Sequence, residues 1–159
     1  MQITQTDFTR LSEEGLREVL KWRNNPSVRE VSRDNSAIAW EAHIEFARNL
    51  AGNAAKKYYK IAIADRENFG GGVIFFTNID GKKAEMGLYK DFNSSVKNMG
   101  AILMNIIFIK VRELGLIELT LCALKTNKIA RELYAKFGFE LDREEENLVY
   151  MRCDLRNKF

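Results

Sequence analysis

The order of apolar and polar residues changes its period several times along the chain, and each change predicts a new element. Residues 3–8 (ITQTDF) alternate and predict a strand, because successive side chains of a strand point to opposite faces. Apolar positions at helical spacing then predict two amphipathic helices, over 12–25 and 39–52. Ser12 suits the N-cap of the first helix, and residues 24–26 (NNP) end it. The apolar stripe of the second helix consists of Trp40, Ile44, Ala47 and Leu50.

The middle of the chain returns to the period of a strand. Residues 57–65 (KYYKIAIAD) and 71–79 (GGVIFFTNI) predict two strands around a turn at 68–71. Asp80-Gly81 is a hairpin signal, and residues 83–92 (KAEMGLYKDF) predict the returning strand. We therefore expect a meander of three strands here.

A nearly unbroken apolar run follows at residues 100–111, interrupted by Asn105 and Lys110. A membrane-spanning helix needs roughly 20 apolar residues. Here Lys110, Arg112 and Glu113 come too early for such a span. The run therefore predicts a helix packed between the sheet and other elements, apolar nearly all round because it is covered on several sides.

The last part of the chain completes an α/β pattern. Residues 117–124 (IELTLCAL) predict a strand, 127–137 predict a helix closed by Gly138, and 138–155 predict two strands around an acidic turn at 142–147. The predicted order is a strand, two helices, three strands, a helix, a strand, a helix and two strands. It indicates a single domain of the α/β class, over the whole chain (1–159), with a mixed central sheet of about seven strands and helices on both faces.

Composition narrows the classes of function. The 159 residues are 46% hydrophobic and 30% charged, with a net charge of +3, which is far from the basic footprint of a nucleic-acid-binding protein. The first 15 residues carry neither a basic n-region nor an apolar h-region, so we expect no secretory leader. Cys122 and Cys153 have no CxxC partner and suit reduced thiols. We expect a cytoplasmic protein without a nucleic-acid or membrane partner.

The loop before the apolar run, residues 93–100 (NSSVKNMG), is a candidate anion site. A helix N-terminus exposes unpaired N–H groups and the positive end of the helix dipole, and both attract phosphate. The alternative is an ordinary N-cap by Ser94 or Ser95. The chain has no GK[ST] of a Walker loop and no GxGxxG of a dinucleotide fold, which excludes both of those phosphate-binding motifs.

A second pattern lies in the last predicted helix, within TNKIARELYAKFGFE (126–140). Asn127, Ala130, Arg131 and Tyr134 follow one another at positions i, i+3, i+4 and i+7, so they share one face of the helix. Taken alone, Tyr134 is either an aromatic at the edge of the core or a catalytic group.

Together the two patterns resemble the GCN5-related N-acetyltransferase (GNAT) superfamily, and the resemblance covers most of the chain. In that family a Q/R-x-x-G-x-G/A loop binds the pyrophosphate of acetyl-CoA through helix N-terminal amides, and N-x-x-A-x-x-L-Y-x-x-x-G-F lies along the pantetheine arm. The second motif is matched in full by Asn127, Ala130, Leu133, Tyr134, Gly138 and Phe139. The first is degraded. Gly100 stands either at the G/A position, with Asn98 and Ser95 at the earlier motif positions, or at the first glycine, with Lys97 and Ile102 as partners.

The resemblance implies acetyl-CoA as the cosubstrate and a set of residues that hold it. We prefer the alignment with Gly100 at the G/A position, because the apolar run then begins where the helix of the family begins. The predicted cofactor-binding residues are Lys97, Asn98, Met99, Gly100, Ala101, Ile102, Asn127 and Arg131.

The N-terminal half carries the resemblance that bears on the acceptor. Residues 22–29 fit W-R-N-x-P-x-V-R, one histidine (His43) follows, and Gly87-x-Tyr89 lies on a central strand. This set is similar to a branch of the family with ribosomal-protein Nα-acetyltransferases and amino-sugar N-acetyltransferases, and most similar to the sugar-nucleotide enzymes of pseudaminic acid biosynthesis, which serve flagellin glycosylation. It implies acetylation of the 4-amino group of a UDP-linked amino-dideoxy sugar.

The same resemblance assigns roles on the substrate side, each with an ordinary alternative. Arg23 and Arg29 are predicted to hold phosphates, or else are solvated charges at the end of a helix. Tyr89 is predicted to line the cleft, or else is a core aromatic. Neither assignment is settled by the sequence.

The chemistry that the resemblance implies is direct attack of an amine on the thioester. Tyr134 is the predicted proton donor to the thiolate, and a backbone N–H of the strand over 85–91 is the predicted oxyanion donor. The base is His43, Glu85 or a water held by backbone carbonyls. A metal site is not expected, because His43 is the sole histidine and has no other ligands at suitable spacing. Protein Nα-acetylation, a non-catalytic acetyl-CoA-binding module and a homodimer stay open as alternatives.

Overall fold

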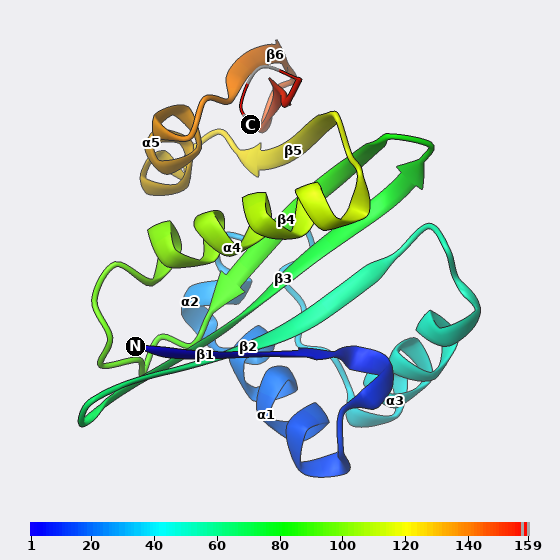
Figure 1. Cartoon of the computed structure of the whole chain (residues 1–159), viewed down its shortest axis with the longest axis vertical. Coiled ribbons are helices and arrows are strands. Elements are labelled where there is room, and N and C mark those ends of the chain that lie inside the picture. Colours follow the sequence, from blue (N-terminus) through cyan, green and yellow to red (C-terminus); the bar gives the residue numbers. More distant parts are fainter. Residues whose placement is uncertain (157, 159) are drawn as a thin grey trace.

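The protein forms one mixed sheet with helices on both sides, as the computed structural model shows for residues 1–156 and 158 (Figure 1). The strands are β1 (Gln2–Asp7), β2 (Lys57–Asp65), β3 (Asn68–Asp80), β4 (Lys83–Lys90), β5 (Glu118–Leu124), β6 (Glu140–Glu144) and β7 (Leu148–Asp154). The helices are α1 (Glu13–Asn24), α2 (Pro26–Arg29), α3 (Trp40–Asn49), α4 (Met99–Leu114) and α5 (Lys128–Lys136). Two 3-10 turns lie at Phe8–Arg10 and Leu50–Gly52. The predicted order of the larger elements is confirmed.

The seven strands are arranged in the order β1-β2-β3-β4-β5-β7-β6. All neighbours are antiparallel except β4 and β5, which are parallel and joined through α4. A parallel pair needs a crossover connection, and the apolar helix provides it. The predicted mixed sheet of about seven strands is therefore confirmed.

Each face of the sheet has its own hydrophobic core. Helix α4 covers one face with the fully buried Leu103, Met104 and Ile107, and α5 packs beside it through Leu133 and Phe137. The other face packs against α1 and α3, in a smaller core built from Phe8, Val19, Trp22, Leu50 and Val73. Side chains alternate along β4. Ala84 and Met86 point into the first core, so every other residue of the strand points toward the second face.

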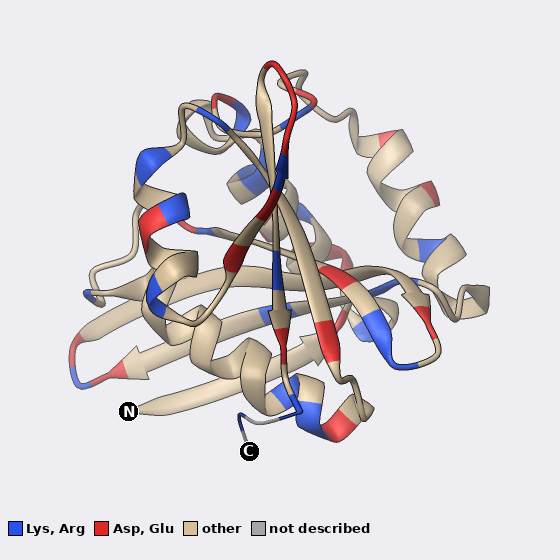
Figure 2. Ribbon diagram, turned by 90° about the horizontal axis from the view of Figure 1, so that it is seen from above, with Lys and Arg blue, Asp and Glu red and all other residues tan. Residues whose placement is uncertain are grey.

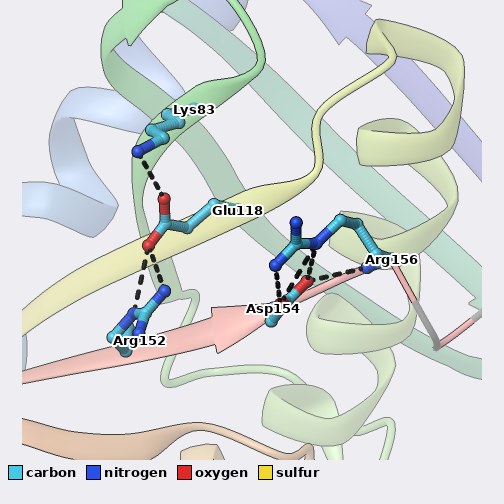
Figure 3. A network of polar contacts seen from close by, with 5 residues as sticks. All are labelled: Lys83, Glu118, Arg152, Asp154 and Arg156. Atoms are coloured by element: carbon cyan, nitrogen blue, oxygen red, sulfur yellow. Dashed lines mark hydrogen bonds and ion pairs between the residues drawn. The ribbon is translucent and has the colours of Figure 1, made fainter.

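Strands β4 and β5 pair over only three positions, which end at Glu85 and Thr120. Glu118 lies at this junction and accepts hydrogen bonds from Arg152 Nε (3.0 Å) and Nη2 (2.6 Å) on β7. Its other oxygen lies 3.1 Å from Lys83 Nζ on β4 (Figure 3). The carboxylate therefore joins three strands at the point where the sheet is held together by the fewest backbone pairs. A separate pair, Arg156 with Asp154, lies beside it at 2.6 Å.

The predicted turn at 68–71 is wrong. Strand β3 begins at Asn68, and the hairpin turns instead at Arg66 and Glu67, with Asp65 opposite Asn68. The three glycines at 70–72 are strand residues paired with β2, and glycine is needed there because neighbouring side chains take the space that a Cβ would need. A Cβ at Gly71 would lie 2.6 Å from the Trp22 ring, and those at the flanking glycines would meet Met99 and Leu103 at 2.7 Å.

Charge and sulfur chemistry add little to the fold. Figure 2 shows Lys and Arg interspersed with Asp and Glu over the ribbon rather than gathered on one face. Cys122 and Cys153 are both free thiols. Within the part of the chain that the structure describes, no helix is long and apolar enough to cross a membrane.

Candidate active site

The short pairing of β4 with β5 opens a cleft of about 890 Å³ between the two strands and across to α1 and α3. Residues of β4 from Glu85 to Lys90 line one side of it, and residues of β5 from Cys122 to Leu124 line the other. Beyond the last pair, Glu85 with Thr120, the two strands exchange no backbone pairs, so polar groups of the backbone are available to a ligand.

The cleft brings together seven of the predicted site residues and leaves the others outside it. Those that line it are Arg23, His43, Glu85, Tyr89, Gly100, Asn127 and Tyr134. Lys97, Asn98 and Met99 line a smaller hollow, which shares Lys90 and Phe92 with the cleft. Ala101, Ile102, Arg29 and Arg131 lie outside both linings.

The loop before α4 leaves the N-terminus of the helix without a side-chain cap. Asn98 occupies the N-cap position with φ +62° and ψ +36°, and its side chain makes no capping hydrogen bond. Neither Ser94 nor Ser95 caps the helix, so that alternative is wrong. Their hydroxyls instead accept hydrogen bonds from the backbone N–H groups of Gly71 (3.2 Å) and Phe69 (2.9 Å) on β3. The first amides of α4 are thus left for an anion.

The left-handed backbone of Asn98 bears on the alignment of the degraded loop motif. Glycine and asparagine are the residues that adopt this conformation most readily. This conformation supports the alignment that puts Asn98 at the first glycine of the motif and Gly100 at the second. Gly100 is also the point where α4 approaches α5, since a Cβ there would lie 3.0 Å from Leu133.

Helix α5 carries Tyr134 into the wall of the cleft. Asn127 caps the helix by accepting a long hydrogen bond (3.4 Å) from the Ala130 N–H, and Arg131 donates to the Lys125 carbonyl at 2.9 Å. Both side chains thus hold the start of α5 in place. Tyr134 is 8% exposed, and burial raises the pKa of its hydroxyl to about 12, so the phenol keeps its proton throughout the physiological range.

An aromatic row that the sequence did not reveal crosses three strands on the side of the cleft that packs against the N-terminal helices. Tyr58 on β2 stacks on Phe75 on β3, with centroids 4.7 Å apart and planes 5° apart. The Phe75 ring lies over Gly87 on β4, where an added Cβ would be 2.2 Å from it. Tyr89 follows two residues later, 6.4 Å from Phe75. The glycine of G-x-Y is therefore the position that admits the Phe75 ring.

Both tyrosines of this row stay neutral. Burial raises the pKa of Tyr58 to about 12, while the positive charge of Arg23 works in the opposite direction. Burial raises the pKa of Tyr89 as well, with a smaller contribution from Tyr58. The row is therefore a wall of uncharged rings and phenol hydroxyls.

Glu85 lies on the same face of β4, at the last residue paired with β5. Asn78 donates to its Oε2 at 3.1 Å, and Arg33 Nη2 lies 3.4 Å from its Oε1. Asn78 adopts φ +50° within the irregular stretch of β3 between Thr77 and Asp80. The carboxylate is 23% exposed and points to the side of the cleft that the N-terminal helices cover.

His43 lies in the buried stripe of α3, which was predicted to consist of Trp40, Ile44, Ala47 and Leu50. The buried positions of the α3 segment are His43, Ala47 and Leu50, at i, i+4 and i+7, while Trp40 and Ile44 are half-buried. His43 Nε2 lies 2.9 Å from the Leu16 carbonyl. Because a carbonyl only accepts, we assign the proton to Nε2, which leaves Nδ1 as the basic nitrogen. Burial lowers the pKa of His43, against the effect of that hydrogen bond.

Arg23 and Arg29 both hold the segment that follows α2. Arg23 Nη2 donates to the Asp34 carbonyl at 3.0 Å, and Arg29 Nε donates to the Asn35 carbonyl at 2.9 Å. Among the residues that the structure describes, Nη1 of Arg23 is the one buried side-chain nitrogen or oxygen without a hydrogen-bond partner. A buried donor normally has a hydrogen-bond acceptor. Arg23 can therefore donate to a ligand in the cleft, whereas Arg29 only holds the loop after α2.

The charges that line the cleft are balanced. Arg23, Arg33 and Lys90 stand against Glu30, Asp34 and Glu85. The prediction that Arg23 holds a phosphate therefore rests on its unpaired Nη1 and not on the net charge of the cleft. Over the described ranges, 1–156 and 158, no cluster of three or more His, Cys, Asp or Glu could hold a metal ion.

Comparisons with known proteins identify relatives of this chain. Acetyltransferase PseH of Campylobacter jejuni is 32% identical to this chain over 146 residues, which cover 91% of the chain and 89% of PseH. PseH from a second strain of that organism is 31% identical over the same length. No protein-family model matches the chain.

Solved structures show the same fold. The crystal structure of C. jejuni N-acetyltransferase PseH in complex with acetyl coenzyme A aligns with a TM-score of 0.76 and 29% identity, over 96% of this chain and 99% of that one. Spermidine N-acetyltransferase from Vibrio cholerae, in complex with CoA and spermine, aligns with a TM-score of 0.83 at 18% identity, over 97% and 96% of the two chains, which bears on the fold alone. The chain therefore belongs to the GCN5-related N-acetyltransferase superfamily, as a relative of the PseH acetyltransferases.

Proposed function

We propose that this protein transfers the acetyl group of acetyl-CoA to the 4-amino group of a UDP-linked amino-dideoxy sugar, the reaction of pseudaminic acid biosynthesis that the sequence resemblance implies. The similarity to PseH over nine-tenths of the chain carries the proposal. A cleft with one side built by α4 and α5 and another built by the N-terminal helices supports it, because two substrates have to meet.

The residues on the donor side fit acetyl-CoA. Helix α4 starts without a side-chain cap after the left-handed Asn98, so the first amides of the helix, up to Ala101, are available to a phosphate, whereas the Ile102 N–H already donates to the Asn98 carbonyl. Lys97 adds a positive charge beside the hollow, and Gly100 lets α4 approach α5. Bound acetyl-CoA supplies an acetyl group activated as a thioester. Asn127 and Arg131 contribute by fixing the start of α5 against that path.

Tyr134 is the group that we assign to protonate the leaving thiolate. Its hydroxyl keeps a proton at neutral pH because burial raises its pKa to about 12. A phenol of that pKa gives its proton only to a strong base, and a thiolate becomes a stronger base when it is released in the same buried wall. Tyr134 thus acts as a hydrogen-bond donor first and as an acid when the charge has formed.

Two residues are candidates for removing the proton of the amine. His43 is neutral because burial lowers its pKa, and its Nδ1 is free to accept. Glu85 lies at the apex of the β4–β5 opening, where the strands still pair. We favour Glu85, because that apex is the place where the donor cleft and the acceptor face of β4 meet, while His43 serves the far end of the acceptor pocket.

The acceptor side offers one half-buried cation, Arg23, and a wall of rings. The buried Nη1 of Arg23 has no hydrogen-bond partner and can donate to a phosphate or carbonyl oxygen. Tyr58, Phe75 and Tyr89 offer flat surfaces on which a sugar ring or a nucleobase can lie. A nucleotide sugar carries both kinds of group, which is why this wall supports it as the acceptor.

Protein Nα-acetylation is the second candidate, and one observation favours it. The carboxylates of Glu30, Asp34 and Glu85 balance the arginines of the cleft, so a positively charged N-terminus would also be tolerated. A non-catalytic acetyl-CoA-binding module would need no proton donor, and the buried Tyr134 argues against it.

Thiol release from acetyl-CoA, read with DTNB, tests the proposal with a 4-amino UDP-sugar and an N-terminal peptide as competing acceptors. A reaction without acceptor corrects for Cys122 and Cys153. We expect turnover with the UDP-sugar; preferential acetylation of the peptide would assign the protein to the second candidate. Addition of CoA at 100-fold its Kd should stabilise the fold by about 2.7 kcal/mol, and no thermal shift with millimolar CoA would refute the donor site.

A further inference from the structure

The segment between α2 and α3, residues 30–39, crosses the cleft on the side of the acceptor. Glu30, Val31, Ser32, Arg33, Asp34 and Ile38 of this segment line the cleft. The segment has no strand pairing of its own and only one helical turn before it, so its position depends on side-chain contacts.

One edge of the segment is held firmly to the N-terminal helices. Asn24 makes two hydrogen bonds with the backbone of Ile38, at 2.8 and 2.9 Å, which fix the end of the segment on α1. Arg23 and Arg29 hold its middle through the carbonyls of Asp34 and Asn35. All of these contacts lie on the side of the cleft that the N-terminal helices form.

A single residue connects the segment to the opposite side of the cleft, which the sheet forms. In the described part of the chain, Arg33 is the only member of the segment whose side chain forms an ion pair or hydrogen bond with the sheet, through Glu85 at 3.4 Å. The charge of Arg33 also reaches Cys122 on β5, where it lowers the pKa of the thiol against the larger effect of burial. The guanidinium therefore lies over the point where β4 and β5 begin to separate.

We propose that Arg33 is a positioning residue of the acetyl transfer. Its ion pair with Glu85 holds the α2–α3 segment across the cleft and turns the Glu85 carboxylate toward the place where amine and thioester meet. Asn78 holds the second oxygen of the same carboxylate from β3, so the two contacts together fix its plane. The role in orienting Glu85 rests on the proposed function, whereas the closing of the segment does not.

The closing is measured by the accessibility of Cys122, which is half-buried in the cleft wall, with the buried Cys153 as an internal reference. In Arg33→Ala, alkylation of Cys122 by iodoacetamide, followed by mass spectrometry, should be about 1.5- to 5-fold faster than in the parent, the range that the loss of one solvent-accessible ion pair allows. Loss of the Arg33 charge alone would raise the pKa of the thiol and slow the reaction, so faster alkylation reports access.

Two variants control this measurement. Arg33→Lys keeps a cation and should react at a rate close to that of the parent. Arg156→Ala removes an arginine that is at least as exposed (66% against 57%) from an ion pair with Asp154 outside the cleft, and should leave the rate at Cys122 unchanged. An Arg33→Ala protein whose Cys122 reacts at the parent rate or more slowly would overturn the closing of the segment.

Kinetics in a second background test the positioning of Glu85. Arg33→Ala should lower kcat by up to about 100-fold, the cost of misplacing a reacting group by roughly 1 Å, with the KM for acetyl-CoA unchanged. In Glu85→Gln the same substitution should have no further effect on kcat, because Arg33 acts through that carboxylate. An equal loss in both backgrounds, or full activity of Glu85→Gln, would overturn the positioning, while the alkylation rates would still decide the closing.

Discussion

Gly87→Ala is the sharpest test of the aromatic row, because the structure gives the size of the conflict. The new Cβ would lie 2.2 Å from Cζ and 2.5 Å from Cε2 of Phe75, both well inside an ordinary contact of 3.4–4 Å. The Phe75 ring cannot simply retreat, because Tyr58 stacks on it at 4.7 Å. The substitution must therefore displace the ring and break the stack.

The expected cost follows from these two effects. Overpacking of a well-filled site costs about 1–3 kcal/mol, and the loss of an aromatic pair costs about 0.5–1.5 kcal/mol more. We expect Gly87→Ala to lower the free energy of unfolding by about 1.5–4.5 kcal/mol. Urea unfolding followed by circular dichroism measures this value as a shift of the midpoint at constant slope.

Matched variants separate this clash from a general effect of alanine. Gly52→Ala adds the same methyl group where no atom lies within 4 Å, and it should leave stability unchanged or slightly improved. Phe75→Leu should relieve the clash, so that Gly87→Ala costs less in that background than in the parent. If Gly87→Ala unfolds within about 0.5 kcal/mol of the parent, the ring does not lie over the glycine and the reasoning fails.

Three further outcomes are expected. Tyr134→Phe keeps the ring and deletes the proton donor, so kcat should fall by about 10²–10⁴-fold while acetyl-CoA affinity in equilibrium dialysis is kept; unchanged turnover would assign the proton to another group. Burial lowers the pKa of His43 below 6.5. If His43 is the base, the kcat–pH profile should fall on the acidic side below that pH, and His43→Ala should remove this fall. If Glu85 is the base, His43→Ala should leave the acidic side of the profile unchanged. Hydrogen bonds from Lys83 and then Arg152 lower the pKa of Glu118 below its ordinary 4.5. Glu118 should therefore stabilise the fold above that pH and lose its contribution as the pH falls further, so the melting temperatures of Glu118→Gln and the parent should converge in acid; a constant gap would contradict it.

The sequence predicts the skeleton of this molecule well, for a physical reason. Strands and helices can be predicted from the spacing of their apolar residues, and single residues mark where they begin and end. Ser12 begins α1 by accepting a hydrogen bond from the Gly15 N–H at 3.1 Å, and Gly138 ends α5 with φ +93°. The motif around Tyr134 is local as well, since one helix face carries it. These features need no knowledge of what packs against them.

The errors arose where a distant neighbour decides the conformation. Gly70 and Gly71 fell in the turn predicted at 68–71, but both pair within a strand, and glycine is needed there because Met99 of α4 and Trp22 take the space of a Cβ. Tyr58 and Tyr59 are adjacent, so the sequence could not tell which of them faces the cleft until the register with Phe75 is known. The signal that was available is Gly87, a glycine in the middle of a strand, which marks a place where another group comes close.

The three-pair junction between β4 and β5 also shapes how the molecule opens. The sheet consists of a four-stranded half, β1 to β4, and a three-stranded half, β5 to β7, and few backbone hydrogen bonds cross between them. In native-state hydrogen exchange, such halves behave as separate cooperative units. The amides of Ile117 and Glu118, which donate to the Lys82 carbonyl at 2.8 and 3.3 Å, should then exchange through separation of the halves, well before the amides at the centre of β3. A ligand that spans the cleft would bind both halves at once and would slow that exchange without touching either amide.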